Sequence, residues 1–253
     1  MPTPVQFMSQ YRKLAVNAVI EDAATGVCRS SAFHVQLRQY FMMDWDAGTE
    51  ERRDYDVVTR GSNSDTWFRL YRNRIRNAAM GKGAPRDYEL ALEWAVRSRR
   101  IASVSQTSMQ TYCDDHLGID CSGFVTNYLI AAGRKTYSDR TVRNTGAASY
   151  YDPDHAVNDP LEIRQGDLLV WMSGTSVKRN PGHVAVVESY SAHSAAGGNM
   201  RVVEATGASA ANPKLLDSMY AVERIINRSG GHPMILVVRR HGRSGSRVTV
   251  MRV

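Results

Sequence analysis

The chain has 253 residues, of which 43% are hydrophobic and 23% charged, so it is long enough to bury one sizeable core with a smaller second unit. The longest uninterrupted apolar stretches, such as MILVV at 234–238, are only of strand length, which excludes a membrane-spanning helix of about 18 apolar residues. The net charge of +7 favours anionic partners, but the basic residues are scattered in short groups, which indicates an ordinary basic surface and no nucleic-acid partner.

The first part of the chain, residues 1–80, favours β-structure. Apolar and polar residues alternate in short runs such as FHVQLRQYF at 33–41 and DYDVVTR at 54–60. The stretch GSNSD at 61–65 has the composition of a turn and precedes TWFRLYR at 66–72. We therefore expect a β-rich N-terminal region of unknown function.

A domain boundary is predicted at GKGAP, residues 81–85, where flexible and helix-breaking residues cluster. The second domain would then span 86–253. It opens with a helical pattern over 86–104, in which one face carries Leu90, Trp94, Arg97 and Ile101.

A second helix is predicted to begin directly after Asp120 and to end before Gly133. Asp is a favoured N-cap residue and Gly a favoured residue just past a helix end. One face of this helix carries the apolar stripe Cys121, Phe124, Val125, Tyr128, Leu129 and Ala132.

Strand-like runs dominate the rest of the chain. They lie at 166–172, 182–190 and 200–206, and a final hairpin is predicted from 233–240 and 247–253. Helices followed by antiparallel strands are typical of an α+β fold.

Cys121 would be the first residue of its helix, which is a favourable place for a nucleophile. A thiol attacks as its thiolate, and the unpaired N–H groups of a helix N-terminus stabilise negative charge there. The small residues Ser122 and Gly123 leave room for a substrate carbonyl. The alternative is an inert, buried helix cysteine. The three cysteines cannot all pair and form no metal-binding spacing, and Cys113 is interpreted as structural.

His183 is the candidate base for such a nucleophile. It follows a Pro-Gly turn and begins a strand in which Val184 and Val186 face one side while His183, Ala185 and Val187 face the other. A surface or structural histidine is the alternative.

Three motifs in this order resemble the NlpC/P60 family of papain-like cysteine peptidases. They are DCSGFV at 120–125, IRQGDLLVW at 163–171 and GHVAVV at 182–187, and the resemblance covers about 105–210. It implies a papain-like α+β fold, with N-terminal helices packed on an antiparallel sheet.

The resemblance also implies roles for individual residues. Cys121 matches the nucleophile, His183 the general base, and Gly166 with Asp167 the pair that opens a central strand beside the site. The family's third catalytic residue lies on the next strand, where this chain has Glu204 in place of the usual histidine. A carboxylate can orient the imidazole and favour its charged form. A solvent-facing glutamate, with His193 as a substitute, is the alternative.

Substrate-binding positions follow from the same resemblance. Asp120 and Ser122 flank the nucleophile, and Tyr112 corresponds to the family's upstream tyrosine, although the usual Gly-Gly pair before Asp-Cys is missing. Arg143 lies in a segment that loosely matches the border of the substrate cleft, so it could contact a substrate carboxylate or be an ordinary surface arginine.

The implied function is a cysteine hydrolase that cleaves an amide bond in bacterial peptidoglycan peptides, without a metal or other cofactor. The start of the chain, MPTPVQFMSQ, does not resemble a secretory leader. We therefore expect a protein made in the bacterial cytoplasm and exported by a specialised system, as a toxin against rival cells. An immunity protein and a component of the secretion machinery would be its partners. A phage-related lysin, a protein that stays inside the cell and a protein whose leader has been removed are the alternatives.

Two alternatives to a wall hydrolase remain at this stage. The same site could act as an acyltransferase, deamidase or protease on a protein or lipid. A non-catalytic basic binding module is the other alternative, and it predicts that Cys121 is no more reactive than an ordinary thiol.

Overall fold

The computed structural model describes residues 1–21, 25–41, 65–179, 182–194, 197–209, 212–226 and 233–253. The helices are α1 (Pro4–Tyr11), α3 (Thr66–Ala79), α4 (Pro85–Arg97), α5 (Gln106–His116), α6 (Cys121–Ala131) and α7 (Asp139–Asn144). The strands are β1 (Leu14–Glu21), β2 (Cys28–Val35), β3 (Gln39–Tyr40), β4 (Gly118–Ile119), β5 (Leu168–Ser173), β6 (Ser176–Val177), β7 (Val184–Ser194), β8 (Gly197–Ala205), β9 (Leu215–Ile226), β10 (Ile235–Arg240) and β11 (Ser246–Met251). Among the helices in these ranges, none is both long and apolar enough to cross a membrane.

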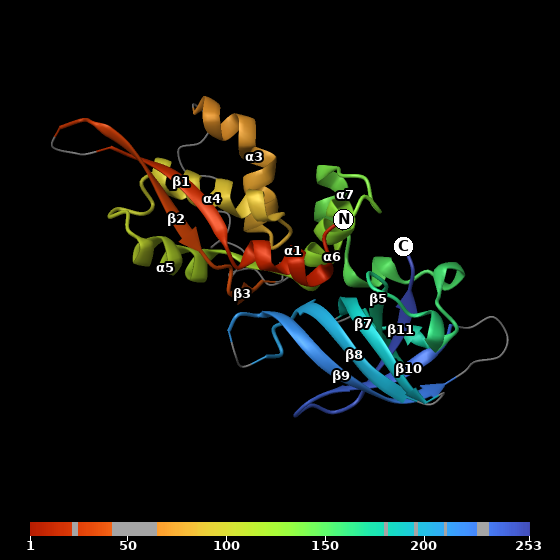
Figure 1. The fold of residues 1–253 in the computed structure, drawn as a ribbon. Helices are drawn as coiled ribbons and strands as arrows, with labels where there is room; N and C mark the ends of the chain where they lie inside the picture. Colours follow the sequence, from red (N-terminus) through yellow and green to blue (C-terminus); the bar gives the residue numbers. More distant parts are fainter. Residues whose placement is uncertain (22–24, 42–64, 180–181, 195–196, 210–211, 227–232) are drawn as a thin grey trace.

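Six strands form a closed antiparallel barrel (Figure 1). The strands β5, β7, β8, β9, β10 and β11 pair in that order, and β11 then pairs with β5 from Arg247↔Met172 to Met251↔Leu168. The papain-like α+β fold, with helices on an antiparallel sheet, is therefore the wrong prediction. The pairing that closes the barrel joins its last strand to its first, so none of these six strands is an edge strand, and the short β6 pairs with the end of β5.

On β5, β7, β8, β9 and β11, the two faces of the strand lie in different hydrophobic clusters. On β7, Ala185 and Val187 belong to the cluster that fills the barrel, whereas Val184 and Val186 face the helices. The alternation predicted for this strand is confirmed. One end of the barrel interior is polar, and the candidate site lies there.

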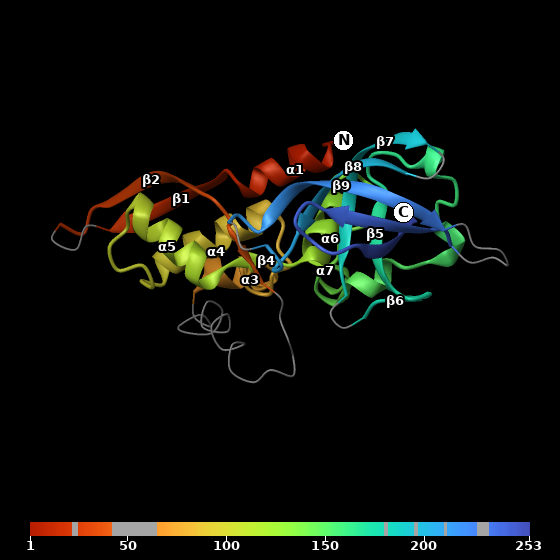
Figure 2. The same ribbon diagram turned by 90° about the horizontal axis from the view of Figure 1, so that it is seen from below.

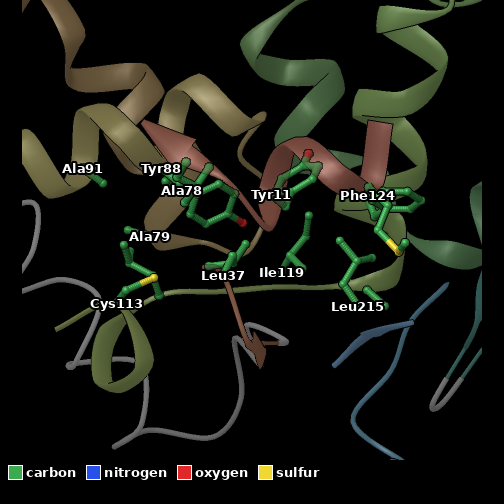
Figure 3. Close-up of a cluster of buried hydrophobic side chains, with 14 of the residues drawn as sticks. Tyr11, Leu37, Ala78, Ala79, Tyr88, Ala91, Cys113, Ile119, Phe124 and Leu215 are labelled. Carbon is green, nitrogen blue, oxygen red and sulfur yellow. The ribbon is translucent and has the colours of Figure 1, made fainter. Parts of the chain in front are cut away.

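Helices α1 and α6 both pack on the barrel and lie between its strands and the helices α3, α4 and α5 (Figures 1 and 2). Phe124 of α6 packs on Tyr11 of α1, and Tyr11 packs on Tyr88 of α4, with ring centroids 6.0 and 5.9 Å apart (Figure 3). The hydroxyl of Tyr11 donates to the carbonyl of Gly83, and that of Tyr88 to the carbonyl of Gly118. Residues from both sides of the predicted boundary thus share one hydrophobic cluster. The two hydrogen bonds also fix the backbone at Gly83 and at Gly118, in the two segments that lie beside the start of α6.

The predicted helix after Asp120 is confirmed as α6. The Asp120 side chain caps it by accepting from the backbone N–H of Gly123, and Gly133 follows the C-cap with a φ of +67°. Gly123 is also required for packing, because a Cβ there would overlap the carbonyl oxygen of Gly81. The chain at 81–82 can therefore pass close to the start of α6.

The N-terminal region is less β-rich than expected. The hairpin of β1 and β2 is present, but α1 and α3 are helices, so the strand-like interpretation of 66–72 is wrong. Asp65, assigned to a turn, caps α3 by accepting from the N–H of Phe68. The runs 54–60 and 61–64 lie outside the described residues. The helix predicted over 86–104 is confirmed as α4 as far as Arg97, whereas residues 98–104 are not helical.

The strand predictions in the second half are confirmed by β5, β7, β8 and the β10–β11 hairpin. Strand β9 was not predicted, although it is the longest strand in the described ranges. It pairs with both β8 and β10, and it carries two of the side chains that hold Glu204.

Candidate active site

Cys121 is buried at the first position of α6, with 5% of its surface exposed. Helix N-terminal N–H groups surround this position and favour a negative charge on the sulfur. Cys28 and Cys113 are also free thiols; Cys28 is exposed, and burial raises the pKa of Cys113 far above that of an ordinary thiol. Among the three cysteines, Cys121 alone lies beside His183, the histidine of the predicted triad.

His183 stands just before β7, on the face of that strand that points into the barrel. Its Nε2 lies 3.0 Å from Glu204 Oε2, and its ring also interacts with the thiol of Cys121. The Trp171 ring lies edge-on to the imidazole, with centroids 4.4 Å apart, and the backbone N–H of Trp171 donates to the backbone carbonyl of His183. The orientation of the imidazole is thus fixed from several sides.

The pKa of His183 reflects these neighbours. Burial lowers it, but the hydrogen bonds and charges of Cys121 and Glu204 outweigh burial and raise the pKa of His183 to about 9. At neutral pH the imidazole is therefore protonated beside the sulfur. A cationic imidazole next to a thiol is the arrangement that stabilises a reactive thiolate.

Glu204 is a buried member of this cluster, with 2% of its surface exposed. While Oε2 faces His183, Oε1 accepts from the hydroxyls of Ser218 and Tyr220, both at 2.9 Å, and from Arg240 at 2.8 Å. Burial raises the pKa of Glu204, but His183, Arg240 and Ser218 hold it below the usual value of a glutamate. The carboxylate is thus ionised and accepts from His183, as an orienting residue must.

The solvent-facing alternative for Glu204 is wrong, and His193 does not replace it. His193 lies near the opposite end of β7 from His183 and is exposed. Asp167, which the resemblance places beside the site, is fully buried and accepts from the guanidinium of Arg252 at 3.0 and 2.9 Å. It anchors the C-terminal segment to β5 and touches no member of the triad.

Tyr40 is a site residue that the sequence did not indicate. It ends β3, which runs parallel to β4 with Tyr40 opposite Ile119, so its ring reaches Cys121. Its hydroxyl interacts with both the side chain and the backbone of Cys121. Burial, the charge of Cys121 and that of Asp120 raise the pKa of Tyr40 well above its usual value. The phenol therefore stays protonated and can donate a hydrogen bond.

The predicted tyrosine, Tyr112, lies elsewhere. It is on α5, where it is 8% exposed and packs on His116 with centroids 4.4 Å apart, and it lines neither pocket described below. Tyr112 is close to Cys121 in the sequence but not in space, because its side chain points from α5 into the hydrophobic core between the helices. In this structure Tyr40 stands beside the nucleophile instead.

Two pockets flank the triad. One, of about 450 Å³, is lined by Cys121, Asp120, Ser122 and Arg143; the other, of about 370 Å³, is lined by His183 and Glu204. Tyr40 and Gly182 line both. The pair Cys121–His183 thus lies between two spaces that can hold the two sides of a scissile bond.

Of the predicted substrate-binding residues, the structure brings Asp120, Ser122 and Arg143 together beside Cys121. Asp120 and Ser122 are nearly buried and bind the ammonium group of Lys82, which was also not predicted. Arg143 is partly exposed in the pocket, and its Nε donates to the carbonyl of Asp139.

Within the described ranges, no group of three or more His, Cys, Asp or Glu residues is arranged to hold a metal ion.

Comparison with known proteins adds no assignment: no family model matches the chain, and neither the curated proteins nor the solved structures contain a match. The geometry of the site therefore carries the functional argument.

Proposed function

We propose that the protein is a cysteine hydrolase that cleaves an amide bond in the peptides of bacterial peptidoglycan. The observation that carries this proposal is the chain of contacts from Cys121 to His183 to Glu204, in which the buried carboxylate accepts from the histidine. A nucleophile, a base and an orienting residue within hydrogen-bond reach are the requirements for covalent acyl transfer.

In the first half of the reaction, the thiolate of Cys121 attacks the carbonyl carbon of the amide. The C–N bond then breaks, the leaving amine takes the proton of the His183 imidazolium, and the acyl group remains on sulfur as a thioester. In the second half, His183 takes a proton from water, whose oxygen attacks the thioester. The C–S bond breaks, the acid leaves, and the proton returns the Cys121–His183 pair to its starting state.

Tyr40 supports the attack by donating to the developing oxyanion. Its hydroxyl and the backbone N–H of Cys121 lie together at the nucleophile. Such donors stabilise negative charge that appears only in the transition state, which is why they contribute to the rate and not to substrate binding.

The choice of substrate has two supports. The motifs at 120–125, 163–171 and 182–187 resemble those of enzymes that act on cell-wall peptides, and the net charge of +7 suits an anionic wall polymer. Both are weaker than the geometry that supports thiol chemistry, so the experiment must test substrate and mechanism separately.

The test is digestion of purified peptidoglycan, with soluble fragments identified by mass spectrometry. The protein is used as a Cys28→Ser variant, which removes the exposed thiol, before and after labelling of Cys121 with iodoacetamide. We expect fragments from the unlabelled protein and none from the labelled protein. The fragment masses identify the bond.

Two results would contradict the proposal in different ways. Fragments that persist after complete labelling of Cys121 would exclude the thiol as the nucleophile. Absence of fragments from several peptidoglycan types, while Cys121 alkylates rapidly at pH 6, would exclude the wall substrate and direct the search to protein or lipid acyl groups.

Tyr40→Phe is expected to lower kcat about 100-fold and to change KM little, because one oxyanion donor is lost while the ring and its packing remain. Steady-state kinetics, measured on a peptide that contains the bond identified by the digestion, check this. Tyr112→Phe removes a hydroxyl from α5 and is the matched control, with kcat expected within twofold of wild type. A larger loss in Tyr112→Phe than in Tyr40→Phe would show that the oxyanion assignment is wrong.

A further inference from the structure

Lys82 places a buried ammonium group beside the nucleophile. Its Nζ lies 2.6 Å from Asp120 Oδ2, 2.5 Å from Ser122 Oγ and 3.2 Å from the carbonyl of Thr145. An ammonium has three donors, and these three acceptors use all of them. Lys82 is 8% exposed, so the charge is held inside the protein.

The backbone around Lys82 is fixed as firmly as its side chain. The N–H of Lys82 donates to the carbonyl of Asn77, and its carbonyl accepts from the side chain of Asn127 on α6, both at 2.8 Å. The preceding Gly81 has a φ of +70° and its carbonyl accepts from the N–H of Asp120. The ammonium position is therefore built by the fold.

This position determines the charge of the pocket beside Cys121. Among the described residues that line that pocket, Asp120 provides the acidic group, and Lys82 already neutralises it. Besides the Cys121 sulfur itself, the other charged groups of the described lining are Arg143 and Arg179. Among the described residues, Arg143 pairs with Asp139 at 4.0 Å, a long contact that leaves most of the guanidinium charge for a ligand.

We propose that Lys82 makes this pocket selective for anions, so that the enzyme prefers substrates with a carboxylate on that side of the scissile amide. The ammonium binds to Asp120, Ser122 and the carbonyl of Thr145, so a substrate amine cannot bind to these acceptors. Arg143 and Arg179 then attract a carboxylate of the substrate. This inference deepens the proposed function and rests on its thiol chemistry at Cys121, but not on the wall substrate.

The test uses charged thiol reagents of similar size, so that no substrate needs to be known. Cys121 in the Cys28→Ser protein is labelled with sulfonatoethyl methanethiosulfonate, an anion, or trimethylammonioethyl methanethiosulfonate, a cation. Rates are measured by intact mass spectrometry at pH 7. The ratio of the anion rate to the cation rate, divided by the same ratio for N-acetylcysteine, reports the charge of the pocket. A change in thiol reactivity affects both reagents alike and cancels in the ratio.

We expect the normalised ratio to be about 10 or more in the wild-type pocket, because fixed charges close to a site act strongly where water is limited. Lys82→Met leaves Asp120 unpaired and should lower the ratio at least about tenfold. The double variant Lys82→Met with Asp120→Asn removes one charge of each sign and should restore a ratio near wild type. Arg143→Gln should lower the ratio by a smaller factor.

The outcomes separate the two proposals. If Cys121 reacts with neither reagent, the thiol chemistry fails and the inference fails with it. If Cys121 reacts readily but the ratio equals that of N-acetylcysteine, or does not change in Lys82→Met, only the inference is overturned. A double variant that behaves like Lys82→Met alone would show a structural effect and would also overturn it.

Discussion

Cys121→Ala is expected to lower kcat/KM for amide cleavage about 10⁶-fold, to a level supported only by binding and the remaining polar groups. The reason is that the nucleophile has no substitute within reach. In the part of the chain that the structure describes, Cys28 is exposed on β2, and Cys113 is buried on α5 with a strongly raised pKa. The measurement is the rate of peptide release by wild type and variant at equal concentrations.

Cys113→Ala and Cys28→Ser are the controls for this loss. Each removes one thiol outside the triad, so each should keep kcat/KM within a few-fold of wild type. Since Cys113 is fully buried, its replacement leaves a small cavity and should lower the melting temperature without affecting the chemistry. Release by Cys121→Ala within tenfold of wild type would refute covalent catalysis at this sulfur.

The parts of the site that lie close together in the sequence could be predicted. Asp120 and Cys121 form one helix start, in which the cap and the position of the nucleophile follow from local preferences. The same holds for His183, because the alternation of β7 assigns it to the barrel side. These features depend on local backbone conformation and a period of two or 3.6 residues, which short sequence patterns carry.

The parts assembled over long distances could not be predicted. Closure of the barrel depends on the pairing of β11 with β5, for which neither strand carries a local signal. Tyr40 reaches Cys121 through the pairing of β3 with β4, and Lys82 through the close approach permitted by Gly123. Neither a pairing of only two residues nor a contact permitted by a missing Cβ produces a periodic pattern in the sequence. Tyr40 and Lys82 therefore resembled ordinary loop and core residues.

Glu204 combines a feature that the sequence indicates with one that depends on residues distant in the chain. Its strand and its place after His183 in the chain order indicated an orienting carboxylate, but its burial depends on Ser218, Tyr220 and Arg240 from β9 and β10. Those donors make an ionised carboxylate stable at 2% exposure, because each supplies a charge or hydrogen bond that offsets the loss of water.

Glu204→Gln is expected to lower kcat about 10⁴-fold although it conserves the shape of the side chain. With the amide oxygen accepting from Ser218, Tyr220 and Arg240, the amide NH₂ faces His183 Nε2. That nitrogen must then accept, so the proton sits on the other ring nitrogen, where it blocks transfer from the thiol. Steady-state kinetics measure the loss, and thermal unfolding checks that the variant is folded.

The pH dependence distinguishes this mechanism from a general loss of structure. In the wild type, the pKa of His183 is raised to about 9, so the imidazolium that protonates the leaving amine is present below that pH and is lost above it. The basic limb of kcat/KM should therefore lie near pH 9. Glu204→Gln removes one of the causes of the raised pKa, so the limb should move to lower pH. Glu223→Gln makes the same chemical change at an exposed pair with Arg239 and should leave the limb in place. A limb that stays near pH 9 in Glu204→Gln would show that Glu204 does not act through His183.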